Sequence, residues 1–285
     1  MSKILQSKEE EMVGNSESQK NLVEKTSPEY WDAFWETNQI PNEIVINKKH
    51  INSYLHTEFD AFFKKHIDKG KEKKLIELGC GNSVWLPYFY KNFNLDVSGL
   101  DYSDLGCERS RFILKKYNTP GRIFEGDLFY PPEELKGKFD YVVSFGVIEH
   151  FRDTVEVLKA HAKYLNISGK IIVSVPNMCG FTGWYQKVMN RAVYDTHVPI
   201  DKNHLEEALL KAGFKNIEVQ YILPIAVSAQ IDGAHKTSFV SFKKLLTLNL
   251  SRLTKIIWAI EIYTSLKFPR SRTFSPALLA YAEKE

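Results

Sequence analysis

The stretch KLIELGCGNS, residues 74–83, decides how the rest of the chain is interpreted. Its first half is a short apolar run of the kind that forms a buried strand. Gly79 and Gly81 follow at once, and glycines at this point let the backbone turn tightly and approach a ligand closely. A helical pattern begins a few residues later, over 84–92. The stretch therefore predicts a strand, a tight turn beside a ligand and a helix, in that order.

The same alternation continues beyond this stretch. Helix-period segments over 104–117, 153–165 and 201–212 separate short runs that are rich in β-branched residues. This alternation is typical of an α/β fold that has a parallel sheet with helices on both faces. We interpret the final run as a last strand that returns to the sheet. The predicted strands after the first are LDVSGLDY (95–102), GRIFEGDLF (121–129), FDYVVSFG (139–146), GKIIVSVPN (169–177), KNIEVQYIL (215–223) and SPALLAYAEK (275–284).

The beginning of the chain differs from this pattern. Its first residues are polar and charged, which is typical of a disordered segment. A capping Ser27 followed by Pro28 marks the start of the first ordered helix, and a second helix is predicted over about 43–68. We therefore predict a disordered tail over 1–26, an N-terminal helical lid over 27–70 and a main domain over 71–285.

Two stretches interrupt the alternation of the main domain. Residues 178–200 are too long for an ordinary loop after a strand, and we predict that they cover a ligand. Residues 236–272 have apolar side chains three or four positions apart, which predicts one long amphipathic helix or two with a break near Asn249. This basic block holds eight Lys and Arg against Glu261 alone, a net charge of +7, so the remainder carries −4. Three interpretations of this block remain open. It forms a cap over the substrate pocket, it lies on an anionic membrane, or it forms a protein interface.

Composition narrows the class of protein. The chain has 285 residues, 44% hydrophobic and 26% charged, which excludes a wholly disordered chain and a polytopic membrane protein. A net charge of +3 provides no whole-chain basic field for nucleic acid. The three cysteines form no C-x-x-C pair, and the N-terminus lacks the apolar core of a signal peptide. We expect a cytoplasmic protein, with a membrane-peripheral location as the alternative.

Acidic residues stand at the ends of the next two predicted strands. Asp101 ends the second strand, where a carboxylate can accept two hydrogen bonds from a ribose diol. Asp127 ends the third, where an acid suits the amino group of a purine. A dinucleotide fingerprint would need glycine at the position of Val84, which disfavours an NAD-dependent dehydrogenase. The strand ends therefore predict a ligand that contains a ribose and a purine.

The motifs ELGCGNS, GLDYS, EGDLF, FDYVVSFGVIEHF and GKIIVSVPN, in this order, resemble the class I S-adenosylmethionine-dependent methyltransferases. The resemblance covers residues 43–223 and is closest to the small-molecule branch that includes the ubiquinone-biosynthesis O-methyltransferases. It implies a Rossmann-like, doubly wound, mostly parallel sheet of seven strands whose last strand is antiparallel. It also implies S-adenosyl-L-methionine as the methyl donor. Ser83 departs from the family pattern, which commonly has a third glycine at this position.

The resemblance implies a role for each residue at the strand ends. In the family, the glycine turn lies beside the methionine part of the donor, and the next two acids hold its ribose and its adenine. Carried over to this chain, Glu77 braces the loop, Gly79 and Gly81 approach the methionine part, Asp101 holds the ribose, Asp127 addresses adenine, Tyr102 and Leu128 flank the adenine ring, and the backbone of Phe145 and Gly146 completes the pocket.

An aromatic helix near the N-terminus lies where this family often places a lid over the cofactor. We predict that Tyr30 and Trp35 contact the pocket, because aromatic faces attract a sulfonium cation and exclude water. The alternative is that the aromatic residues of this helix, Trp31 and Phe34 in particular, only dock it on the sheet.

Two histidines are the candidate catalytic residues. A hydroxyl acceptor benefits from a general base, and His150 follows the fourth strand beside the expected methyl group. His197 lies in the predicted cover insertion. The alternatives are that His150 only orients its loop and that His197 is a surface residue. Glu149 and His150 also resemble a metal pair, but with two potential ligands we predict no metal.

The sequence thus predicts methyl transfer from S-adenosylmethionine to the oxygen or nitrogen of a small-molecule acceptor, by in-line displacement. Proximity and orientation can supply roughly 7–11 kcal/mol of such a barrier. A non-catalytic S-adenosylmethionine-binding scaffold and an RNA or protein methyltransferase are the alternatives. The fourth strand ends in SFGVIEH and lacks the Asn/Asp-Pro-Pro-aromatic sequence that is associated with exocyclic amino methylation, which disfavours nucleic acid.

Overall fold

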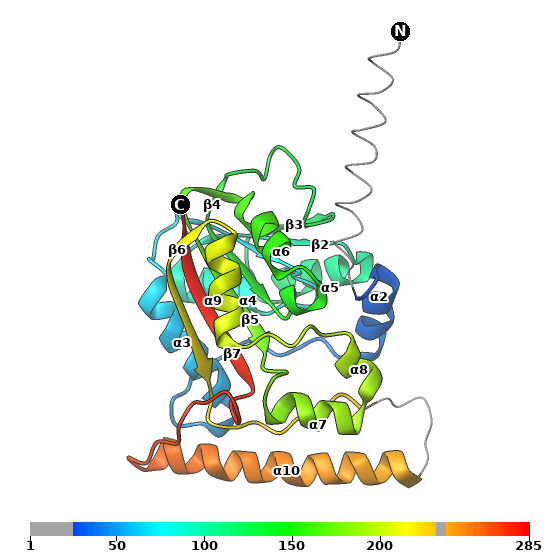
Figure 1. Cartoon of the computed structure of the whole chain (residues 1–285). Coiled ribbons are helices and arrows are strands. Elements are labelled where there is room, and N and C mark those ends of the chain that lie inside the picture. The colour runs from blue at the N-terminus through cyan, green and yellow to red at the C-terminus, as the bar shows by residue number, and fades with distance from the viewer. Residues whose placement is uncertain (1–24, 232–237) are drawn as a thin grey trace.

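A computed structural model describes residues 25–231 and 238–285. Figure 1 shows a central sheet between layers of helices, with a long helix across one end of the molecule. The predicted tail over 1–26 lies outside the described residues except for its last two, Lys25 and Thr26. Within the described ranges, no helix is long and apolar enough to cross a membrane.

The sheet has seven strands in the order β3-β2-β1-β4-β5-β7-β6 within the described residues. Strands β1 to β5 pair in parallel, whereas β7 runs antiparallel to both β5 and β6. This confirms the predicted doubly wound sheet with one antiparallel strand. The strands are β1 (Lys74–Leu78), β2 (Asp96–Asp101), β3 (Gly121–Glu125), β4 (Phe139–Phe145), β5 (Leu165–Pro176), β6 (Phe214–Ile222) and β7 (Ala277–Lys284).

Alternate side chains of the central strands enter two apolar cores, one on each face of the sheet. Val142 of β4 belongs to one core, and its neighbours Tyr141 and Val143 belong to the other. Both faces of a strand are therefore buried, which is why these runs are apolar almost throughout. The helices that connect or cover the strands are α3 (Tyr54–His66), α4 (Trp85–Phe93), α5 (Asp104–Lys116), α6 (Thr154–Ala162) and α9 (Lys202–Lys211).

Local signals explain where the helices begin. Ser27 accepts a hydrogen bond from the Tyr30 N–H and caps α2 (Pro28–Thr37), as the sequence predicts. The second predicted helix is shorter than expected, because it begins with a 3-10 turn, η1 (Ile51–Ser53), that leads into α3. The β-branched run before it is not helical, and the Ser53 hydroxyl holds this segment by donating to the Val45 carbonyl at 2.9 Å.

The two irregular stretches add helices beyond the carboxyl ends of β5 and β6. The predicted cover insertion forms α7 (Phe181–Met189) and α8 (Arg191–Asp195). The basic block forms α10 (Ser238–Tyr263), one unbroken helix without a break at Asn249. Lys236 of that block lies outside the described residues. A short 3-10 turn, η2 (Ile148–His150), follows β4 and completes this end of the sheet.

Candidate active site

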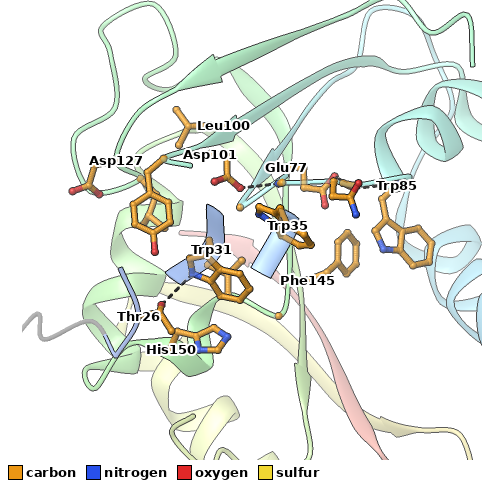
Figure 2. A pocket seen from close by; sticks show the side chains of 18 of the residues that line it. Thr26, Trp31, Trp35, Glu77, Trp85, Leu100, Asp101, Asp127, Phe145 and His150 are labelled. Atoms are coloured by element: carbon orange, nitrogen blue, oxygen red, sulfur yellow. Dashed lines mark hydrogen bonds between the residues drawn. The ribbon is translucent and has the colours of Figure 1, made fainter. Parts of the chain in front are cut away.

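A cavity of about 290 Å³ lies where the carboxyl ends of β1, β2 and β4 meet α2. Figure 2 shows its side chains converging from the sheet on one side and from α2 on the other. Most of the residues predicted from the strand ends are brought together here. The lining includes Trp35, Glu77, Gly79, Gly81, Asp101, Tyr102, Asp127, Leu128, Phe145, Gly146 and His150.

The turn after β1 requires glycine for space and for conformation. Gly79 has a φ of +72°, and a Cβ there would lie 2.4 Å from Cγ2 of Val147. A Cβ on Gly81 would lie 2.9 Å from Nε1 of Trp35 and 3.0 Å from Oδ2 of Asp101. A larger residue at either position would therefore fill the cavity or displace its wall.

Ser83, which departs from the glycine pattern, has a defined structural role. Its hydroxyl donates to Oε2 of Glu77 at 2.7 Å and accepts from the Trp85 N–H at 3.0 Å. The same oxygen thus braces the buried acid of β1 and satisfies the first backbone N–H of α4. The serine completes the turn without glycine.

Two buried carboxyls line the wall of the cavity nearest this turn. Asp101 accepts from the Gly81 N–H at 2.7 Å and from the Ser103 N–H at 2.9 Å. Burial raises the pKa of Asp101 to about 6, against the effect of these backbone hydrogen bonds, and raises the pKa of Glu77 to about 8. Both groups are therefore poised to gain their full negative charge when a cation lies beside them.

The charge of the lining indicates what kind of ligand fits. Glu77, Asp101 and the more exposed Asp127 are its acids, and among the described residues no Lys or Arg lines the cavity. Asp127 accepts from the Phe129 N–H at 2.8 Å, which orients its carboxylate. An acidic cavity favours a cationic ligand over a phosphate-rich one.

The aromatic wall of α2 differs from our prediction. Trp31 and Trp35 line the cavity, and their rings stack at 5.8 Å with an angle of 26°. Residues four apart share one face of a helix, so Tyr30 lies off that face and is not among the lining residues. The Trp31 Nε1–H donates to Oγ1 of Thr26 at 3.2 Å. Arg109 of α5 holds the end of α2 by donating to the carbonyls of Trp35 and Asn38.

A second aromatic wall comes from the sheet side. Trp85, the first residue of α4, stacks on Phe145 at 5.0 Å with an angle of 29°. Trp85 was not among the predicted site residues, although a bulky residue directly after a glycine turn was the available signal. The lining residues outside our prediction are Thr26, Trp31, Asn82, Ser83, Val84, Trp85, Leu100, Gly126, Val147 and Phe151.

His150 lies on the cavity wall at the end of η2. Its Nδ1 is 2.9 Å from the carbonyl oxygen of Thr196, which can only accept, so Nδ1 carries the proton and Nε2 keeps its lone pair. Burial, together with the neighbouring His197, lowers the pKa of His150 to about 3, although the hydrogen bond to Thr196 opposes the change. The imidazole is therefore a neutral acceptor at pH 7.

His197 lies behind His150 and is not among the lining residues. The two ring centroids are 4.8 Å apart, and Nδ1 of His197 is 2.8 Å from the Val193 carbonyl oxygen. The turn that follows α8 directs this side chain toward His150, and His197 is half-buried rather than fully exposed. Burial lowers the pKa of His197, so a second neutral imidazole supports the first. The structure thus places His197 beside His150 rather than in contact with a ligand.

Glu149 makes this pair a cluster of three potential metal ligands. One ligand atom from each of Glu149, His150 and His197 lies within 4.8 Å of the others. Oε2 of Glu149 is buried and has no hydrogen-bond partner among the described residues, and burial raises the pKa of this carboxyl to about 8. The sequence showed only two adjacent ligands, and the fold adds the third. Such a set can hold a divalent cation.

A family profile described as a methyltransferase domain matches residues 48–219, more than half of the chain. Among curated proteins, the chain is 28% identical over 162 residues to a tRNA U34 carboxymethyltransferase of Aliarcobacter butzleri, covering 52% of this chain and 49% of that protein. It is 26% identical over 156 residues to a ubiquinone biosynthesis O-methyltransferase of Pelagibacter ubique, covering 54% and 62%. The chain thus spans about half to two thirds of the length of these relatives.

Among solved structures, the fold is similar to a geranyl diphosphate C-methyltransferase of Streptomyces coelicolor in complex with Mg²⁺, geranyl diphosphate and S-adenosyl-L-homocysteine. The TM-score is 0.59 at 12% identity, and the match covers 90% of this chain and 98% of that one. At this identity the likeness concerns the fold alone.

Proposed function

The chain belongs to the class I S-adenosylmethionine-dependent methyltransferases, and from this premise we propose that it methylates a hydroxyl or amino group of a small-molecule acceptor. One observation carries the proposal. A neutral His150 on the cavity wall has its Nδ1–H bound to a carbonyl and its Nε2 lone pair left to accept a proton. The relative that is named a ubiquinone biosynthesis O-methyltransferase supports the choice of a small acceptor.

The residues of the cavity fit the methyl donor. S-adenosylmethionine supplies a methyl group that its sulfonium has already activated. The donor carries positive charge at the sulfonium and at its amino group, which suits the acidic lining. We assign Asp101 to the ribose hydroxyls and Asp127 to the adenine amino group. Tyr102 and Leu128 flank the adenine ring, Gly79 and Gly81 leave room for the methionine part, and the Phe145–Gly146 backbone closes the pocket.

The chain's own residues then perform two tasks. Trp31 and Trp35 exclude water from the reacting groups, which strengthens electrostatic interactions inside the cavity. Nε2 of His150 accepts the proton that the acceptor's O–H or N–H loses, and the resulting imidazolium keeps its Nδ1–H bond to the Thr196 carbonyl. A general base whose pKa lies near the operating pH contributes roughly 10²- to 10⁴-fold to a rate, and the lowered pKa of His150 puts its contribution at the lower end of this range.

An acceptor screen tests this function. Purified protein is incubated with S-adenosylmethionine and pools of phenols, alcohols and amines, and release of S-adenosylhomocysteine is measured. We expect turnover with at least one small hydroxyl or amino compound. Donor binding without turnover of any pool would favour the alternative of a non-catalytic binding scaffold.

An RNA acceptor is the second candidate, because three curated relatives are named tRNA U34 carboxymethyltransferases. Against it, no Lys or Arg of the described residues lines the cavity to pair with a phosphate backbone. Transfer of labelled methyl to total tRNA, together with a steep loss of tRNA binding as salt rises, would replace the small-molecule proposal.

A further inference from the structure

Helix α10 presents a row of large apolar side chains to solvent. Phe242, Leu245, Leu253 and Ile256 are 60%, 56%, 56% and 57% exposed. Their spacing puts them on one face of the helix, where Tyr263 continues the row at 68% exposure. Single exposed apolar residues are ordinary, but two apolar pairs on one face, with only the exposed Asn249 between them, mark a surface that meets a partner.

The opposite face of α10 is fixed to the protein, so this row cannot turn inward. The Thr254 hydroxyl accepts from the Val227 N–H at 3.1 Å, and the Trp258 Nε1–H donates to the Ile225 carbonyl at 2.8 Å. Glu261 is buried and accepts from the Phe268 N–H at 2.5 Å. These bonds set the rotation of the helix about its own axis.

Only part of the positive charge of the basic block is available at this surface. Arg270 pairs with Glu261 at 2.8 Å and with Glu58 at 3.0 Å, and Arg272 pairs with Asp201 at 3.1 Å. These two arginines anchor the segment after α10.

Basic side chains on α10 itself, unlike those two arginines, have neutral hydrogen-bond partners. Arg252 donates to the amide oxygen of Asn249 at 3.4 Å, and Lys255 donates to that of Asn52 at 3.3 Å. Both of these acceptors are uncharged. Lys244 is exposed and lies three turns before Lys255 on the same side of the helix. These three cations border the apolar row.

We propose that α10 docks on an anionic lipid surface, with its apolar row in the outer acyl region and Lys244, Arg252 and Lys255 on the lipid phosphates. Apolar side chains bordered by long basic ones are the pattern of a helix that lies in the membrane interface. Charge complementarity selects lipid over a second copy of the chain, because two such faces would bring like charges together. This docking does not depend on the proposed methyl transfer.

Docking would also orient the active site. Helix α10 packs on residues that follow β6 and on α7, which follows β5, and the Tyr185 and Thr247 hydroxyls meet at 2.8 Å. Figure 1 shows α10 crossing the end of the molecule toward which β6 points. The cavity also lies at the carboxyl ends of its strands, so docking would turn this edge of the sheet toward the lipid.

Vesicle co-sedimentation of the full chain tests the proposal. We compare vesicles of phosphatidylcholine alone with vesicles that also contain phosphatidylglycerol, and expect binding to the mixed vesicles only. The Leu253→Glu/Ile256→Glu double variant should bind at least about 100-fold more weakly. Lys244→Gln and Lys255→Gln should each weaken binding about fivefold. The matched control is Ile167→Glu, because Ile167 is 88% exposed on β5, away from α10. This variant should bind the vesicles as tightly as the wild-type protein.

Two results would overturn the proposal. One is the absence of binding to anionic vesicles, or equal binding by the double variant, in protein that still binds S-adenosylhomocysteine in calorimetry and is therefore folded. The other is a dimer in light scattering that the double variant dissociates while the wild-type protein ignores lipid, which would assign this face to a second copy.

Discussion

The two ends of the cavity respond to burial in opposite directions. At one end, burial raises the pKa of Glu77 and of Asp101. At the other, burial lowers the pKa of His150 and of His197. The cause is the same at both ends, because a low-dielectric site disfavours whichever form is charged. At pH 7, burial therefore keeps Glu77 and the two histidines mostly neutral, whereas Asp101 remains largely ionised.

Substitution of His150, at the end of the cavity that His150 and His197 form, should have the largest effect on turnover. We expect His150→Gln to lower kcat by about 10²-fold, the lower end for a general base because the pKa of His150 is lowered to about 3. The affinity for S-adenosylhomocysteine should stay within about twofold, because Glu77 and Asp101 are untouched. Steady-state kinetics and calorimetry on the same protein provide the two numbers. His204→Gln is the matched control, since His204 is exposed on α9. An unchanged kcat in the His150 variant would leave this residue only the role of orienting its loop.

The acidic end should affect donor binding rather than the chemical step. Asp101→Asn keeps the shape of the side chain but removes its charge. We expect donor affinity to fall by about 10- to 100-fold, in line with the usual energy of a charged hydrogen bond. Calorimetry measures the change, and Asp104→Asn, at an exposed position on α5, is the control. Unaltered affinity would remove Asp101 from the donor site.

The pH dependence of donor binding separates the two ends further. The pKa of Asp101 is raised to about 6, so below this pH the carboxyl is protonated and must release a proton before it can accept hydrogen bonds from both ribose hydroxyls. Affinity should therefore fall as pH decreases, by about tenfold between pH 7 and pH 5. Asp32 on α2 is the nearby acid that adds to this shift. Titration by calorimetry should give a flat profile for Asp101→Asn, and a wild-type profile equally flat would refute the assignment.

Removal of divalent metal ions should have the smallest effect on turnover. We assign His150 to proton transfer and propose no metal at the cluster of Glu149, His150 and His197, so dialysis against EDTA should change turnover by less than about twofold. Readdition of Mg²⁺, Mn²⁺ or Zn²⁺ to the dialysed protein is the control. If dialysis abolishes turnover and one of these ions restores it, Glu149, His150 and His197 form a metal site instead.

Much of the fold could be predicted because strands and helices leave local periodicities. The ends of strands β1 to β7 differ from those of the predicted runs by at most four residues, and the order of elements is as expected. The helix predicted from about residue 43 was too long, because apolar spacing alone does not distinguish a helix from a β-branched extended segment that packs beside one. Likewise, spacing could not decide whether α10 breaks at Asn249.

The candidate site could be predicted where it depends on strand ends. Asp101, Asp127 and the glycine turn lie where the order of parallel strands requires. Tyr30 and Trp31 are neighbours in sequence, and only the rotation of α2 against the sheet puts Trp31 rather than Tyr30 in the cavity. Thr26 reaches the cavity from the segment predicted as a tail, which no periodicity could show.

By itself, the sequence determined the strands of the sheet, the edge at which we predict a ligand and the acidic residues at that edge. Each of these follows from patterns within a few residues. The tertiary structure decided what depends on segments distant in sequence. It brought His197 to within ring contact of His150, and it turned the apolar row of α10 away from the core. The physical reason is that local periodicity shows which side of an element is apolar, whereas packing alone decides what that side meets.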